Sequence, residues 1–264
     1  MNGRISVRLA FSALSAILAL AGCQAPTPYP QFSEMSPSAM ALLGQHHIVG
    51  SSVHNSPIMI QVFGQGPDVT LILATIHGDE PAGTPLVRNL ANHIRSHLEL
   101  ANGRTIVLLP VANPDGLAQN TRYNANGVDL NRNFSASNRI EAATAGRSAL
   151  SEPESRVITE IIAEYAPDRI VSIHQRRNDQ PGCIDYDGLA GDLARRMARY
   201  CPLPVDKLGA QPGSLGSYAG LNLLIPIITL EMQTSDSQLS SYSLWQRYGK
   251  ALLAAITYPN APEL

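Results

Sequence analysis

The sequence predicts a single α/β domain built on a mixed, mostly parallel twisted sheet that is flanked by helices. Short apolar strands alternate along the chain with segments of helical spacing, which is the order that places helices against a largely parallel sheet. The 264 residues are 44% hydrophobic and carry a formal net charge of −2, which suits one domain with a sizeable core. This charge balance does not favour nucleic acid as a partner.

Apolar periodicity between turn residues sets the expected elements. Runs rich in β-branched residues predict strands at 58–63, 69–76, 105–111, 169–173 and 226–232. Apolar residues that recur every three or four positions predict helices at 82–98, 153–165, 188–200 and 241–256. Ser151, with Glu154 three residues later, predicts a capping box for the second of these helices. Segment 113–134 is rich in turn residues and is expected to be a loop.

The first 22 residues have the pattern of an export signal. A basic start precedes an apolar run that is too short to span a bilayer comfortably as a permanent helix. The run ends in Leu20-Ala-Gly-Cys23, which resembles a bacterial lipobox. Cys23 is therefore expected to carry a lipid that anchors the protein to the membrane. An ordinary signal peptide with an incidental Cys is the alternative.

The predicted processing also sets the domain boundaries and the location. Residues 23–45 would be a polar tether, and residues 46–264 would be the folded domain. We expect this domain on the periplasmic side of the cell envelope, and Gln24 after the cysteine favours the outer membrane. In an exported domain, Cys183 and Cys201 could close a disulfide worth about 3 kcal/mol. Two buried free thiols are an equal alternative.

The most informative stretch is the apolar run that ends in His77-Gly-Asp-Glu80. A strand that stops at a His and turns directly into a Glu holds an imidazole and a carboxylate where both can reach one metal ion. His174 ends another apolar run in the same way. Because ligands gather at the carboxyl ends of parallel strands, both His are expected at one site. Without that context, a lone His at a strand end is more often a satisfied half-buried residue.

Two His and one carboxylate form a catalytic zinc set that leaves a fourth position for water. Zinc lowers the pKa of that water to about 7 and polarises a bound carbonyl. The sequence therefore predicts one Zn²⁺ per chain at His77, Glu80 and His174. A second pair, His93 and His97, has helical chelating spacing but lacks the intervening Glu of a zincin helix, so we interpret it as solvated polar surface.

Further segments carry a resemblance to a known family. In chain order they are His77-x-x-Glu80, Asn113-Pro-Asp-Gly116, Arg122, Gly127-Val-Asp-Leu-Asn131-Arg132-Asn-Phe134, Ser172-Ile-His174 and Thr229-Leu-Glu231. Together they resemble the zinc carboxypeptidase family from about residue 55 to the end of the chain. The resemblance implies that family's α/β fold and hydrolysis by a zinc-bound water. Segments 182–188 and 212–220 resemble its murein peptide amidase A branch, which cleaves the bond from γ-D-glutamate to diaminopimelate.

The resemblance also implies a role for each matching residue. Glu231 would be the general base, although a buried Glu with a purely structural partner is the alternative. Arg122 would stabilise the oxyanion that forms on the scissile carbonyl. Asn131 and Arg132 would bind the free α-carboxylate of the substrate, because the planar fork of Arg matches a carboxylate. A surface ion pair is the alternative for Arg132.

Selectivity is expected from charges near the end of the substrate. Diaminopimelate has a second ammonium and a second carboxylate, so Asp185 is the candidate acid and Arg176 or Arg177 the candidate base. Solvated loop charges are the equal alternative. The mobile Tyr of the family's digestive enzymes is absent from residues 207–213, and Tyr218, which follows, is a further candidate for substrate contact.

The sequence thus predicts zinc-dependent hydrolysis of the γ-D-glutamyl-meso-diaminopimelate amide bond in murein peptides. One alternative is a carboxypeptidase that trims stem peptides of intact peptidoglycan. Another is a non-catalytic lipoprotein that binds murein. No obligate protein partner is evident from the sequence.

Overall fold

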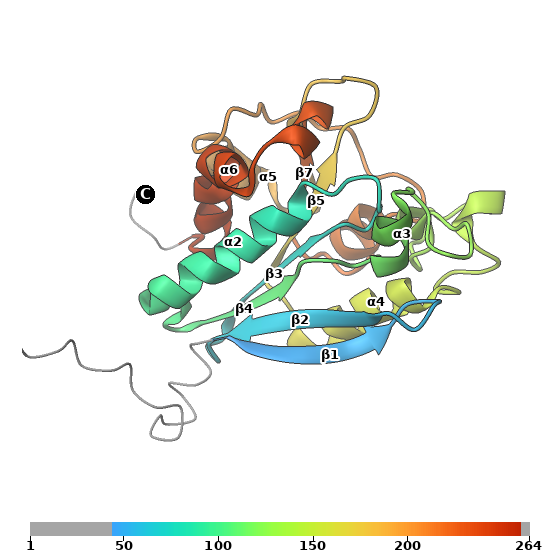
Figure 1. Ribbon diagram of the computed structural model, residues 1–264, viewed down its shortest axis with the longest axis horizontal. Coiled ribbons are helices and arrows are strands. Elements are labelled where there is room, and N and C mark those ends of the chain that lie inside the picture. Colours follow the sequence, from blue (N-terminus) through green and yellow to red (C-terminus); the bar gives the residue numbers. More distant parts are fainter. Residues whose placement is uncertain (1–43, 260–264) are drawn as a thin grey trace, which may run out of the picture. The chain divides into compact units, whose positions relative to one another are not determined.

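A seven-stranded mixed sheet lies at the centre of the computed structural model, which describes residues 44–259 (Figure 1). Its strands are β1 (Gln45–Ser51), β2 (Pro57–Phe63), β3 (Asp68–Ala74), β4 (Arg104–Leu109), β5 (Arg169–Gln175), β6 (Cys183–Asp187) and β7 (Ile227–Met232). Their spatial order is β1-β2-β4-β3-β5-β7-β6. The inner strands β4, β3, β5 and β7 pair in parallel, whereas β1, β2 and β6 pair antiparallel. The predicted α/β class with a mixed sheet is confirmed.

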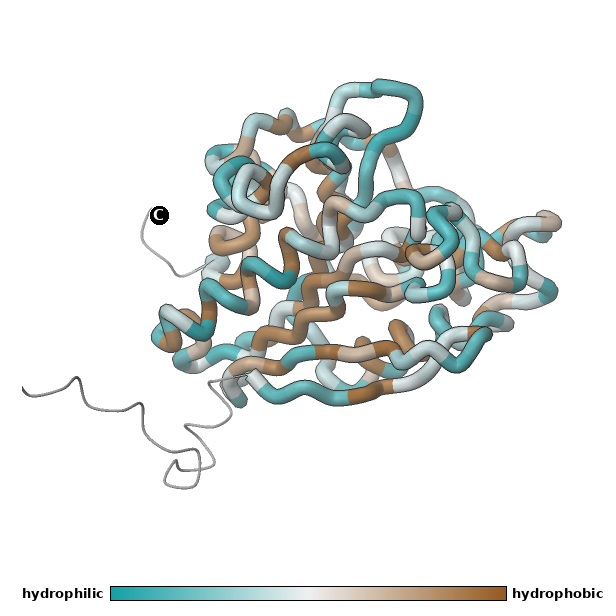
Figure 2. Tube along the Cα trace, in the orientation of Figure 1, coloured by the Kyte–Doolittle hydropathy of each residue, from teal (hydrophilic) through white to brown (hydrophobic). Residues whose placement is uncertain are grey.

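Helices cover both faces of this sheet and enclose two apolar cores. On one face lie α2 (Gly83–Ser96), α5 (Gly191–Ala198) and α6 (Ser241–Ile256), with α2 and α6 side by side (Figure 1). On the other face lie α4 (Pro153–Tyr165) and a π-helical segment, Gly216–Asn222. Along β3, Ile72 points into the first core while Leu71 and Leu73 point into the second. Inner strands that are buried on both faces explain the continuous apolar runs of the sequence, seen as brown tube in Figure 2.

Several elements differ from their sequence prediction. Strand β6 was not predicted, because its sequence Cys-Ile-Asp-Tyr-Asp carries two carboxylates. Strand β1, at the sheet edge, has mostly exposed polar residues and was also missed. The predicted loop 113–134 contains a short helix, α3 (Pro114–Gln119). The predicted capping box is wrong: Glu152 precedes α4 without a side-chain cap, and the Ser151 hydroxyl donates to Glu152 instead, at 2.7 Å.

The possible disulfide is not formed. Cys183 is a free, buried thiol on β6, and Cys201 is a free thiol after α5 that donates to the carbonyl of Met197 at 3.7 Å. Burial raises the pKa of Cys183 to about 11, so the thiol stays protonated and unreactive at neutral pH.

The predicted export signal, Cys23 and nearly all of the predicted tether lie outside the described residues. Within residues 44–259, no helix has both the length and the apolar character needed to cross a membrane.

Candidate metal centre and active site

The turn after β3 is built by tight backbone contacts. Thr75, directly after the strand, has a left-handed conformation (φ 58°), which costs a β-branched residue about 1–3 kcal/mol. Its carbonyl accepts from the backbone amide of Asn113 at 2.9 Å. A Cβ on Gly78 would lie 1.9 Å from the backbone carbonyl carbon of Gly116, so only glycine fits between His77 and α3 at this point.

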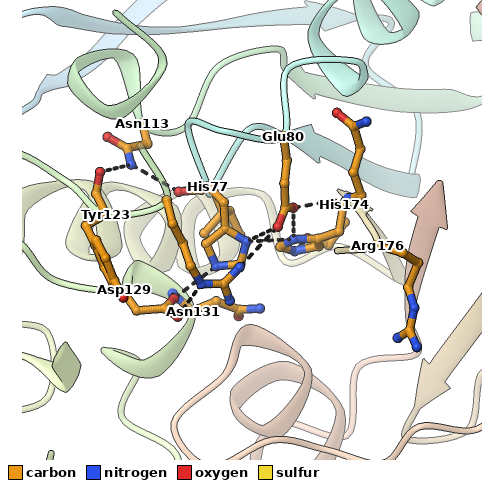
Figure 3. Close-up of polar contacts among 12 residues, drawn as sticks. His77, Glu80, Asn113, Tyr123, Asp129, Asn131, His174 and Arg176 are labelled. Carbon is orange, nitrogen blue, oxygen red and sulfur yellow. Dashed lines mark hydrogen bonds and ion pairs between the residues drawn. The ribbon is translucent and has the colours of Figure 1, made fainter. Parts of the chain in front are cut away.

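Asn113, the first residue of the Asn-Pro-Asp-Gly segment, stabilises this turn through hydrogen bonds of its side chain. Its side-chain oxygen caps α3 by accepting from the amide of Gly116 at 2.9 Å. Its side-chain nitrogen donates to the carbonyls of Ile76 and Tyr123, both at 3.2 Å (Figure 3). The segment thus positions the backbone immediately before His77.

His77, Glu80 and His174 converge at the end of the parallel strands. Nδ1 of His77 lies 2.8 Å from Oε1 of Glu80, and Nδ1 of His174 lies 2.8 Å from Oε2 of the same carboxylate. The two Nδ1 atoms are 3.2 Å apart. Figure 3 shows Glu80 reaching between the two rings. All three residues are buried, and their ligand atoms lie within 4.8 Å of one another.

The outer nitrogens of both rings have partners that orient them. Nε2 of His77 lies 2.9 Å from Oδ1 of Asp129, and Nε2 of His174 lies 3.1 Å from the hydroxyl of Ser172. The backbone amide of Gln175 donates to Oε2 of Glu80 at 3.1 Å. A carboxylate or hydroxyl on the outer nitrogen of a ligating His is the usual support of a metal site, because it fixes the ring and increases its basicity.

Buried charges in this cluster strongly favour a cation. Burial alone would lower the pKa of His77, but the carboxylates of Glu80 and Asp129 raise it to about 9. Burial would raise the pKa of Glu80 and of Asp129, yet the neighbouring positive charges hold both well below their usual range. Because the carboxylates of Glu80 and Asp129 stabilise the protonated imidazole of His77, they would also stabilise a divalent cation bound at the same position.

The residues fit zinc. Two ligands that bind tetrahedral Zn²⁺ at about 2.1 Å lie about 3.4 Å from each other. The donor atoms here are 2.8 to 3.2 Å apart and consist of two imidazole nitrogens and one carboxylate, which is a catalytic zinc set.

A cavity of about 210 Å³ opens over the three ligands, and most of the predicted site residues line it. They are His77, Glu80, Arg122, Asn131, Arg132, His174, Arg176, Arg177 and Glu231. Gln175, Gln180 and Gln211 also line it and were not predicted. The structure therefore brings together the residues that belong to widely separated segments of the sequence.

Glu231 stands on β7 directly beside His174 on β5, as its register partner. Burial raises the pKa of Glu231, and the positive charge of His174 only partly opposes this. A carboxylate with a raised pKa next to the metal ligands is suited to accept and return a proton near neutral pH.

Hydrogen bonds hold the polar side chains of Arg122, Asn131 and Arg132 in position. Nε of Arg122 donates to Asp129 at 2.9 Å and one of its Nη atoms donates to Glu80 at 3.2 Å, so its guanidinium lies beside the ligands. The side-chain oxygen of Asn131 accepts from the amide of Leu215 at 2.8 Å, which leaves its NH₂ group as the donor available in the cavity. Arg132 donates to the carbonyl of Asn131 at 2.6 Å and lines the same cavity.

The remaining candidates divide between two places. Asp185 lies in a second cavity next to the first, and Arg176 lines both. Tyr218 lines neither: its ring stacks on Phe134 at 6.0 Å between centroids and belongs to the second core. The structure therefore does not bring Tyr218 to either cavity, because the π-helical segment packs its partly buried ring against Phe134.

His93 and His97 lie away from the metal centre, between α2 and α6. Their rings stack at 4.0 Å, and His93 lies 5.1 Å from the ring of Trp245. Asp129 was not among the predicted site residues, although it lies in the Gly-Val-Asp-Leu-Asn-Arg segment that carried the resemblance. That segment was the one signal for Asp129, because its partner His77 is 52 positions away in the chain.

A family model for zinc carboxypeptidases, Peptidase_M14, matches residues 33–178. The chain belongs to the zinc carboxypeptidase family. Murein peptide amidase A of Escherichia coli K12 is 36% identical over 176 residues, which cover 58% of this chain and 67% of that protein. The enzyme of the same name from Vibrio campbellii is 29% identical over 211 residues, which cover 73% of this chain and 79% of that protein.

Solved structures have the same fold as this chain. The crystal structure of murein-tripeptide amidase MpaA from Escherichia coli O157 has a TM-score of 0.61 and 27% identity, covering 82% of this chain and 93% of that one. Bovine thrombin-activatable fibrinolysis inhibitor, at 16% identity and a TM-score of 0.68 over 81% of this chain, shares the fold. This zinc carboxypeptidase is thus a hydrolytic metalloenzyme, and the predicted zinc cofactor is confirmed.

Proposed function

We propose that this zinc carboxypeptidase hydrolyses the amide bond between γ-D-glutamate and meso-diaminopimelate in murein peptides. The observation that carries the proposal is the single cavity that holds three buried metal ligands, a carboxylate of raised pKa and a guanidinium–amide pair. The similarity of the chain to proteins named murein peptide amidase supports the substrate class.

Each residue has a task that its position allows. When bound by His77, Glu80 and His174, zinc supplies Lewis-acid activation of water and of the scissile carbonyl. Glu231 accepts a proton from the attacking water and returns it to the nitrogen of the leaving residue. Arg122 donates to the oxygen that gains negative charge on the scissile carbon.

Substrate binding is assigned to Asn131 and Arg132, which line the same cavity as the metal ligands. Arg132 pairs with the free α-carboxylate of the terminal residue, and the NH₂ group of Asn131 donates to the same carboxylate. Because a carboxylate that is bound here places the preceding amide bond over the ligands, the enzyme releases the terminal residue of its substrate.

The non-catalytic alternative is not favoured, because all residues of the metal set and the base occupy one cavity. A trimming carboxypeptidase would instead act on stem peptides that are still attached to intact peptidoglycan. We therefore propose a comparison of the free murein tripeptide with intact sacculi, each incubated with the zinc-loaded protein. We expect diaminopimelate to be released faster from the free tripeptide than from sacculi. Faster release from sacculi would favour the trimming enzyme, and binding of sacculi without release from either would favour the murein-binding lipoprotein.

We also propose that the enzyme is anchored by a lipid on Cys23 and acts on the periplasmic side of the envelope, at the outer membrane. The support is the lipobox-like order Leu20-Ala-Gly-Cys23 and the Gln that follows. Metabolic labelling with a palmitate analogue is expected to tag the wild-type chain and not C23A. Equal labelling of both, or of neither, would contradict the anchor.

A further inference from the structure

Four exposed leucines lie on the two loops that join β6 and β7 to the rest of the fold. Leu221 is in the last turn of the π-helical segment, and Leu223 and Leu224 follow it before β7 begins; they are 49%, 42% and 68% exposed. Leu189 comes two residues after β6 and is 85% exposed. Single exposed leucines are common, but a group of them on neighbouring loops marks a contact with a membrane or a protein.

The loops that carry these leucines are in contact. Strands β6 and β7 are antiparallel, with Asp187 at the end of β6 opposite Ile227 at the start of β7. A Cβ on Gly188 would lie 2.8 Å from the backbone carbonyl oxygen of Gly220, so the two loops pack backbone against backbone. The four leucines therefore belong to one region of the surface, which we call the leucine patch.

Leu224 has an unfavourable backbone conformation as well as an exposed side chain. Its φ of 58° lies in the left-handed region, which leucine adopts at a cost and which glycine or asparagine adopts readily. Because most of the side chain is exposed, packing within residues 44–259 does little to offset this cost. No charged residue or His occurs between Lys207 and Glu231, so the segment carries no charge that would oppose transfer to an apolar phase. Both features favour a contact outside the described fold.

The leucine patch lies at the amino ends of the parallel strands, and the chain enters the domain at that same end. Gln45, the first residue of β1, and Ile227, the first residue of β7, lie in one row across the sheet, which runs through the register partners Val62, Val107, Leu71 and Ile170. His174 and Glu231 lie four residues farther along β5 and β7, about 13 Å away along the strands. The predicted tether therefore joins the domain at the end that carries the leucine patch, and the metal centre lies at the other end.

We propose that the leucine patch inserts into the surface of a lipid bilayer. The choice of partner rests on the proposed lipid anchor: Cys23 is 21 positions before Gly44, so even a fully extended tether spans at most about 70 Å. A tether of this length raises the local concentration of the bilayer at the patch, so weak insertion by a few leucines is sufficient. With the patch on the membrane, the metal centre is at the end of the sheet remote from the bilayer, where it stays accessible to peptides in the periplasm.

Binding to vesicles tests the proposal without the anchor and without substrate. A chain that begins at Gln24 has no acyl group and keeps both apolar cores, which lie within residues 44–259. This chain, loaded with zinc, is mixed with vesicles of phosphatidylethanolamine and phosphatidylglycerol, and the bound fraction is measured by flotation at low and high salt. We expect binding that persists at high salt, because contacts of apolar side chains are not screened.

The variant L224N separates membrane contact from folding. Asparagine tolerates a φ of 58° better than leucine, so L224N is expected to unfold at the same or a higher temperature than wild type. Loss of the leucine from the bilayer surface is expected to lower the partition coefficient about 10-fold. The matched control is I48T, which changes an exposed residue (69%) on β1, at the opposite edge of the sheet from β6, and is expected to keep wild-type binding.

Absence of vesicle binding by the wild-type chain, or equal binding by wild type and L224N, would overturn the inference. A wild-type dimer that L224N converts to monomers, with no binding to vesicles, would assign the leucine patch to a second copy of the chain instead. Palmitate labelling and tripeptide hydrolysis test the proposed function separately. If labelling does not depend on Cys23 while the vesicle results hold, the anchor fails and the leucine patch remains a membrane contact.

Discussion

His174 and Glu231 are register partners on the parallel strands β5 and β7, so the third metal ligand and the proposed base stand side by side. His77 follows β3, on the other side of β5, at the same edge of the sheet. Adjacent strands thus set the positions of His174 and Glu231, whereas His77 and Glu80 lie in the turn after β3, which ends at Ala74. The site therefore lies at the carboxyl ends of three inner strands of the sheet.

Replacing Glu231 by Gln separates catalysis from metal binding. The amide keeps the size of the side chain but cannot accept the proton, so we expect kcat to fall by about 10²- to 10⁴-fold. Because Glu231 is not one of the three ligands, zinc content by mass spectrometry is expected to stay at one ion per chain. Full activity in E231Q would exclude Glu231 as the base, and loss of zinc would make it a ligand.

Asp129 is expected to act through His77. Its carboxylate lies 2.9 Å from Nε2 of His77 and also accepts from Arg122 at 2.9 Å. Removing its charge in D129N is expected to weaken zinc binding by about 10- to 100-fold, as measured by competition with a chelator. D192N, which changes an exposed Asp on α5, is the matched control and is expected to keep wild-type affinity. Equal affinities in the two variants would leave Asp129 without this role.

Zinc binding is expected to release a proton at pH 7.5. The pKa of His77 is raised to about 9, so without zinc the ring is largely protonated at this pH, whereas a metal ligand must be neutral. The apparent affinity for zinc should therefore rise with pH up to about 9 and then level off. Calorimetry in buffers of different ionisation enthalpy measures the protons released; a value near zero at pH 7.5 would contradict the charge balance described for this site.

Gly78 is expected to tolerate no side chain. A Cβ there would lie 1.9 Å from the backbone of Gly116, so G78A must displace the turn that carries His77 and Glu80. We expect a loss of about 1–3 kcal/mol in the free energy of unfolding, together with weaker zinc binding. At Gly191 the nearest atom is 3.4 Å from an added Cβ, and G191A is expected to change neither quantity substantially. Wild-type zinc binding in G78A would show that the close approach is not needed.

Local patterns explain what the sequence could predict. His77-x-x-Glu80 and the apolar runs before His174 and Glu231 each lie within a few residues, and strand direction then places them at one edge. Helix α4 has its predicted bounds for the same reason, since periodicity is a local property. In contrast, β6 was missed because Asp185 and Asp187 give it the composition of a loop, and their burial becomes apparent only when β7 and Gly216 lie beside them.

Long-range contacts explain the remaining differences. The roles of Asp129 and Ser172 depend on which ring nitrogen each one meets, and the sequence does not contain that information. Arg176 lines both cavities, whereas Arg177 lines only the zinc cavity. This difference depends on how the chain leaves β5, where the backbone amide of Arg176 still donates to the carbonyl of Met232. Tyr218 was a reasonable candidate by position, but the π-helical segment turns its ring onto Phe134.

Zinc held by His77, Glu80 and His174 is proposed to make this protein a hydrolase of the γ-D-glutamyl-diaminopimelate bond. Mass spectrometry of the products from the free murein tripeptide tests it most directly, with the protein zinc-loaded, treated with a chelator, and reloaded with zinc. We expect free diaminopimelate and the matching shortened peptide in the first and third samples and intact tripeptide in the second. Cleavage at another bond, or equal cleavage in all three samples, would contradict it.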